Sequence, residues 1–144
     1  MALAIGAIPD DVRTLLIRIQ NDLFDVGADL CTPVVDEPKM EPLRVIQSQV
    51  DALEVAIDRY NAELASLRSF VLPGGTKEAA LLHVARTVSR RAERCTWAAI
   101  HAFGGGVNPL TAKYLNRLSD LLFVLARYAN RSVGDELWVP GANR

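Results

Sequence analysis

The stretch Lys77–Phe103, KEAALLHVARTVSRRAERCTWAAIHAF, decides the fold because it is long, amphipathic and free of glycine and proline. Thr76 stands before it as a helix N-cap, and the glycines of Gly104–Gly106 end it. Asn108 is then placed to cap a further helix that has Pro109 in its first turn. The sequence therefore predicts two successive helices joined by a short connection.

Apolar residues recur at helical spacing elsewhere in the chain. Residues 12–27 form one such segment, with Gly27 as its expected C-cap, and residues 45–68 form another. Three prolines within residues 31–42 indicate a surface loop between them, and the last helix covers residues 110–130. Because no long alternating pattern is present, we predict an all-α antiparallel helical bundle in one domain, residues 1–144, with four full helices. The apolar residues 1–8 are interpreted as the remnant of a first helix.

The helix over residues 77–103 has two distinct faces at about 100° per residue. Arg86, Arg90, Glu93 and Trp97 lie on a stripe about 40° wide, away from the expected core face. Two guanidinium groups one turn apart can hold phosphate oxygens, and the carboxylate can orient one of them or help hold a metal-bound phosphate. A solvated face with ordinary ion pairs explains the pattern equally well. The expected core face consists of Leu81, Ala85, Val88, Ala92, Cys95 and Ala99.

The helix over residues 110–130 also carries a polar stripe. Asn116, Asp120, Phe123 and Arg127 lie on one side, opposite a leucine face. An amide, a carboxylate and a cation are thus in line on one helix. The alternative is that Asp120 only forms an ion pair, with either Arg117 or Arg127. The leucine face consists of Leu118, Leu121 and Leu125.

Composition excludes several classes of protein. The chain has 144 residues, 50% of them hydrophobic, which is enough for one buried core. Sixteen basic against seventeen acidic residues give a net charge of −1, which disfavours nucleic-acid binding. No apolar run is long enough to span a membrane, and Cys31 and Cys95 fit a reducing, cytoplasmic location. His83 and His101 lack further ligands at metal-binding spacing, so no metal site is predicted.

Five segments, taken together, resemble one known family. They are IQNDLFDVGADL (19–30), FVLPGG (70–75), HVARTVSRRAER (83–94), KYLNRLSDLLF (113–123) and LWVPG (137–141). They are similar, in this order and over nearly the whole chain, to the PduO-type ATP:cob(I)alamin adenosyltransferases. The patterns R-x-x-x-R-R-x-E-R and N-R-L-S-D are the most specific part of the resemblance.

The resemblance implies a five-helix bundle that assembles as a homotrimer, with ATP and cobalamin bound between subunits. It implies that Arg90, Glu93 and Asn116 contact ATP, which is a co-substrate supplied with Mg²⁺. Arg86 matches an arginine in an inter-subunit ion pair needed for activity, and Phe70 matches an aromatic residue on the lower corrin face. The implied reaction transfers the 5′-deoxyadenosyl group of ATP to Co(I) and releases triphosphate. A reductase and an adenosylcobalamin-dependent acceptor enzyme are the implied protein partners.

One departure from the family pattern lies at the N-terminus. The family begins with a T-x-T-G-D-x-G-T segment and a helix whose aspartate pairs with the Arg86 equivalent, and neither is present here. Residues 1–8 align with the last turns of that helix, so we expect a family member lacking its first segment. The alternative function is a non-catalytic truncated paralogue that oligomerises or binds a corrinoid. Triphosphate binding distinguishes the two.

Overall fold

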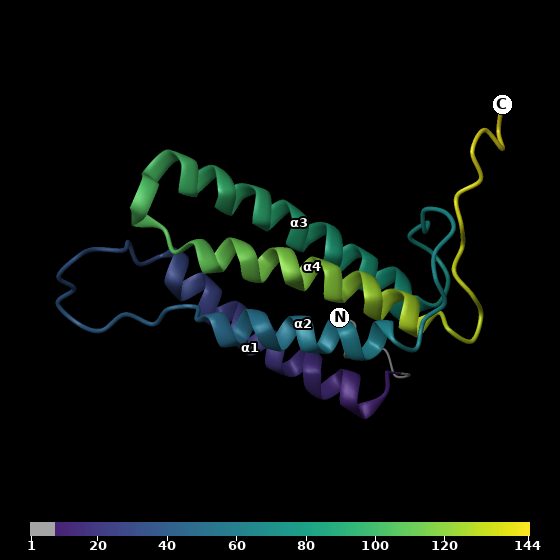
Figure 1. Ribbon diagram of the computed structural model, residues 1–144, viewed down its shortest axis with the longest axis horizontal. Coiled ribbons are helices and arrows are strands. Elements are labelled where there is room, and N and C mark those ends of the chain that lie inside the picture. Colours follow the sequence, from purple (N-terminus) through teal and green to yellow (C-terminus); the bar gives the residue numbers. More distant parts are fainter. Residues whose placement is uncertain (1–7) are drawn as a thin grey trace.

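The computed structural model describes residues 8–144, and their regular structure is helical (Figure 1). The predicted all-α class is confirmed. Of the predicted first-helix remnant, residues 1–7 lie outside the described residues. The helices are α1 (Asp10–Leu30), α2 (Gln47–Asn61), α3 (Lys77–Phe103) and α4 (Pro109–Ala129), and Gly104–Gly106 form a 3₁₀ turn, η2.

Helix α4 is the centre of the bundle. It runs antiparallel to α3 on one side and packs against α2 on the other (Figure 1). Helix α1 is joined to α2 by side-chain hydrogen bonds, such as that from Arg59 to Asp11. The predicted leucine face is buried: Leu118, Leu121 and Leu125 are at most 2% exposed. Tyr114 is also buried, and its hydroxyl donates to the carboxylate of Asp22 on α1 (3.0 Å). The core therefore lies along α4, and α3 forms one outer wall of the bundle.

The predicted start signals of α3 and α4 are confirmed. The Thr76 hydroxyl accepts a hydrogen bond from the amide of Ala79 (3.2 Å), and the Asn108 side chain accepts one from the amide of Leu110 (3.0 Å). Pro109 occupies the first turn of α4, where no intrahelical amide is needed. These local hydrogen bonds fix the residues at which α3 and α4 begin.

Helix α1 is longer than predicted. Gly27 was expected to end it, but the Gly27 carbonyl accepts from the amide of Cys31 (3.1 Å) and the helix continues to Leu30. The extra turn is stabilised by Asp29, whose buried carboxylate accepts from Arg44 (2.7 Å) and from Asn108 (2.7 Å). These partners come from distant parts of the sequence, so local signals could not predict the end of the helix.

Helix α2 is shorter than predicted. It ends at Asn61 instead of near Arg68, and the chain then turns, with the amide of Leu64 donating to the Asn61 carbonyl (3.0 Å). Leu64 still packs on the core although it is not helical. The apolar spacing was therefore a correct sign of burial but a wrong sign of helix length.

The predicted core face of α3 is only partly correct: Ala85 and Ala92 pack against the core, but other predicted members do not. Val88 is 48% exposed and Cys95 is exposed. Most of the buried positions lie roughly 100° further around the helix. The aliphatic face instead lines an open groove of about 380 Å³ together with Leu16, Ile19 and Leu23 of α1. The cause is that α3 has apolar side chains over a wide arc, so its pattern alone does not say which side meets α4. The buried residues of α3 are Ala79, Leu82, His83, Ser89, Glu93 and Thr96.

Candidate functional site

The carboxylate of Glu93 links the two polar stripes. Its side chain is only 6% exposed because it lies between α3 and α4. One oxygen accepts from Arg90, one turn earlier on α3, and the other accepts from the side-chain amide of Asn116 on α4 (2.9 Å). The three residues predicted to act together are therefore in one hydrogen-bonded network. A charged bond of this kind is stronger than a neutral one, so the network also fixes the register of the two helices.

Arg117 extends this network and was not among the predicted site residues. Its guanidinium donates twice to the side-chain oxygen of Asn116 (2.6 and 3.1 Å) and forms an ion pair with Asp120 (2.9 Å). The structure thus settles the open choice of partner for Asp120. The sequence feature that could have identified Arg117 as a site residue is its position next to Asn116 in the N-R-L-S-D motif. With its oxygen held by Arg117 and its nitrogen by Glu93, the amide of Asn116 has one defined orientation.

Arg90 has the geometry of an anion-binding side chain. Its side chain is 45% exposed, and Glu93 holds one of its terminal nitrogens. A guanidinium has five N–H donors in a planar fork, so the rest of the fork can bind phosphate oxygens. The buried carboxylate of Glu93 holds the guanidinium of Arg90 in place, and the remaining N–H groups of Arg90 are open to solvent.

Arg86 and His83 lie further towards the start of α3. His83 is 2% exposed, and neither ring nitrogen has a hydrogen-bond partner among residues 8–144. Burial, and then the charge of Arg86, lower the pKa of His83, while the charge of Asp135 raises it. The ring is therefore neutral near pH 7. The buried Nε of Arg86 also lacks a partner within the described part of the chain.

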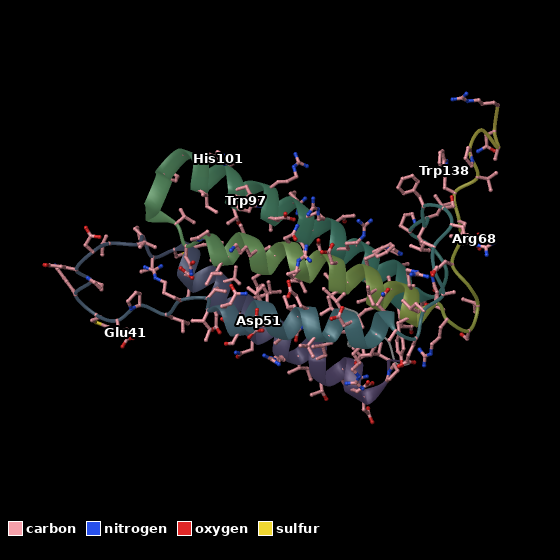
Figure 2. The ribbon with its side chains drawn as sticks, viewed as in Figure 1. Glu41, Asp51, Arg68, Trp97, His101 and Trp138 are labelled. Atoms are coloured by element: carbon pink, nitrogen blue, oxygen red, sulfur yellow. The ribbon has the colours of Figure 1, made fainter. Side chains whose placement is uncertain are left out.

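Phe70 lies outside the Glu93 network. It is in the segment that leads into α3, where its ring is 75% exposed and packs on Trp138, with ring centroids 5.8 Å apart. Figure 2 shows Trp138 beyond the N-terminal end of α3 and Trp97 in the opposite half of that helix. Trp97 is 38% exposed. Trp97 was predicted on the polar stripe of α3 and Phe70 on the corrin face, whereas no role was predicted for Trp138.

Comparison with known proteins agrees with this geometry. The family model for cobalamin adenosyltransferase matches residues 1–129. The chain belongs to the cobalamin adenosyltransferase family. A corrinoid adenosyltransferase of Mycobacterium tuberculosis is 60% identical over 143 residues, which are 99% of this chain and 74% of that protein. A corrinoid adenosyltransferase of Bacillus subtilis is 42% identical over 125 residues, 87% of this chain and 62% of that protein.

A solved structure extends the match to three dimensions. It is a variant of the PduO-type ATP:corrinoid adenosyltransferase from Lactobacillus reuteri complexed with cobalamin and ATP. It is 35% identical, with a TM-score of 0.86, and the match covers 96% of this chain and 75% of that one. The helical arrangement of Figure 1 is thus that of the cobalamin adenosyltransferase family.

Two kinds of feature are absent from the described residues. Within residues 8–144, no group of three or more His, Cys, Asp or Glu side chains is arranged to hold a metal ion. None of the described helices is both long and apolar enough to cross a membrane.

Proposed function

We propose that this cobalamin adenosyltransferase family member transfers the 5′-deoxyadenosyl group of ATP to Co(I) of cobalamin and releases triphosphate. The observation that carries the proposal is the bonding of Arg90 and Asn116 to one buried carboxylate, Glu93. Such a cluster presents a cation and an amide in fixed positions to an anionic nucleotide. The kinship with proteins named corrinoid adenosyltransferases supplies the reaction class.

The ATP side of the site is assigned to α3 and α4. Arg90 would bind triphosphate oxygens through the part of its fork that Glu93 does not use, and Asn116 would hydrogen bond the nucleotide. Glu93 orients both. Mg²⁺ usually keeps most of its water shell and binds through phosphates, so we expect it to arrive on the triphosphate.

The corrinoid side is assigned to Phe70. Its exposed ring can lie against the lower face of the corrin and exclude the lower axial ligand from cobalt. A four-coordinate Co(II) is easier to reduce, so exclusion favours formation of Co(I). The organometallic chemistry belongs to the substrate, and the protein positions it.

In the transfer step, the electron pair of Co(I) forms a bond to C5′ of the ribose. The bond between C5′ and the triphosphate oxygen breaks, and its electron pair leaves with the triphosphate. Arg90 stabilises the charge that develops on this leaving group. Holding cobalt and C5′ in line removes the entropy cost of their encounter.

The assembly and cellular context are also proposals. We place Arg86, half-buried on α3, at the contact between subunits of a homotrimer. A reductase would supply the electron for Co(I), and an adenosylcobalamin-dependent enzyme would receive the product. We expect this to take place in the cytoplasm.

The test is a single reaction mixture of the protein with chemically reduced cobalamin, ATP and Mg²⁺. Absorbance follows the formation of the cobalt–carbon bond, and chromatography identifies the phosphate product. Triphosphate in equal amount to adenosylcobalamin is the expected result. Binding of cobalamin without any triphosphate release would contradict the proposal and support the non-catalytic, corrinoid-binding alternative.

A further inference from the structure

The chain after α4, residues 133–144, forms a C-terminal arm that returns to the segment before α3 (Figure 1). Val71 and Leu137 form an isolated antiparallel bridge. The amide of Trp138 donates to the Phe70 carbonyl (2.8 Å), and the Ser69 hydroxyl donates to the Trp138 carbonyl (2.6 Å). The backbone of Trp138 is thus hydrogen-bonded directly to that of Phe70.

An ion pair holds the arm on the bundle. Asp135 accepts from the Nε of Arg127 on α4 (2.8 Å), and both side chains are largely buried. A terminal nitrogen of Arg127 also donates to the carbonyl of Ala65 (2.7 Å). One arginine therefore joins α4, the turn after α2 and the arm. Removing one partner of a buried pair leaves an uncompensated charge, so loss of Asp135 should release the arm.

The two aromatic rings that this arrangement brings together face solvent. Phe70 is 75% exposed and Trp138 is 44% exposed, and their planes are tilted by 59°. Exposing aromatic rings to water costs free energy, and such rings are common where a flat apolar partner binds. The pair is built from two segments that meet only in the folded chain.

We propose that Trp138 is a second corrinoid-contacting residue and that Asp135 is the positioning residue that keeps it beside Phe70. The proposal rests on the proposed function, because the corrinoid is assigned to this surface by its continuity with Phe70. The flat corrin macrocycle would then contact both aromatic rings, those of Phe70 and Trp138. The arm is thereby part of the substrate site.

The first test measures the dissociation constants of cobalamin and of ATP by equilibrium dialysis for the wild-type chain and for Trp138→Ala. Cobalamin binding should weaken about tenfold, equivalent to about 1.4 kcal/mol, and ATP binding should not change. Trp138→Phe should retain most of the affinity. Phe103→Ala, which truncates an exposed aromatic residue at the far end of α3, is the matched control and should behave as wild type.

The outcomes separate this inference from the proposed function. Unchanged cobalamin affinity in Trp138→Ala, or equal weakening of cobalamin and ATP, would overturn the inference and leave the proposed function standing. A smaller particle in light scattering with normal cobalamin affinity would show that the ring contacts a second copy, which also overturns it. Failure of the wild-type chain to bind any cobalamin would overturn both.

The second test addresses Asp135 without any ligand. The chain has two tryptophans, so Trp97→Phe leaves Trp138 as the only tryptophan, and its emission can be excited selectively over that of the tyrosines. In that background, Asp135→Asn should shift the emission to longer wavelength and raise quenching by acrylamide, while Asp135→Glu should restore both in part. Asp11→Asn breaks the exposed Arg59–Asp11 pair and should change neither. Unaltered Trp138 emission in Asp135→Asn would overturn the positioning role.

Discussion

The bond between Asn116 and Glu93 can be tested by the substitution Asn116→Leu, which preserves side-chain shape and removes both polar atoms. Glu93 is 6% exposed and accepts from Asn116 at 2.9 Å. The substitution leaves one carboxylate oxygen buried without its donor. Loss of a hydrogen bond to a charged group costs about 1.5–3 kcal/mol.

Part of this loss is offset. Asn116 is half-buried, so the leucine regains at most about 1 kcal/mol from apolar burial. Arg117 loses its two bonds to Asn116 but keeps Asp120 and some solvent contact. The expected net loss in the free energy of unfolding is therefore about 1–2 kcal/mol, which lowers the Tm by about 3–6 °C.

The assay is urea unfolding followed by circular dichroism, with the slope m checked against wild type. Asn21→Leu makes the same chemical change at an exposed position of α1 and should alter stability by no more than about 0.5 kcal/mol. ATP affinity of Asn116→Leu should also fall at least tenfold. Equal stability of Asn116→Leu and wild type would refute the α3–α4 register described above.

Four further predictions concern other parts of the site. Arg90→Ala should weaken ATP binding in calorimetric titration by about 1.5–3 kcal/mol, and Arg91→Ala, off the stripe, should not; equal effects would show that the face assignment is wrong. Phe70→Ala should slow adenosylation of cobalamin much more than of cobinamide, which has no dimethylbenzimidazole ligand to exclude, and an equal loss of rate on both would mean that the ring only packs. The pKa of His83 is lowered in the folded chain, so as the pH falls the unfolded chain takes up this proton before the folded chain does. The free energy of unfolding should therefore decrease as the pH drops below about 6.5. His83→Gln should reduce the difference in the free energy of unfolding between pH 7.5 and pH 5, measured by urea unfolding. Light scattering should detect an oligomer in which the face that carries Trp97 is covered, and a clean monomer at micromolar concentration would contradict that assembly.

The family motifs predicted the candidate site residues from the sequence. R-x-x-x-R-R-x-E-R and N-R-L-S-D pointed to Arg90, Glu93 and Asn116, and the structure places these three in one network. The ATP-binding roles of these three residues remain proposals, as do the roles of Arg86 and Phe70. The polar stripes by themselves fit a solvated surface equally well, because periodicity shows which residues share a face of a helix but not what that face contacts.

Signals that act within a few residues determined the start of α3 at Thr76, its end at the glycines and the start of α4 at Asn108, since caps and turns depend on neighbouring backbone groups. Contacts between distant segments decided the rest. Helix α1 runs past Gly27 because Asp29 finds Arg44 and Asn108. The buried side of α3 is the one that meets α4, and it is not its most aliphatic side. The arm lies beside Phe70, where Val71 bridges Leu137 and Asp135 pairs with Arg127. Each of these choices depends on burial and on partners that become neighbours only when the chain folds.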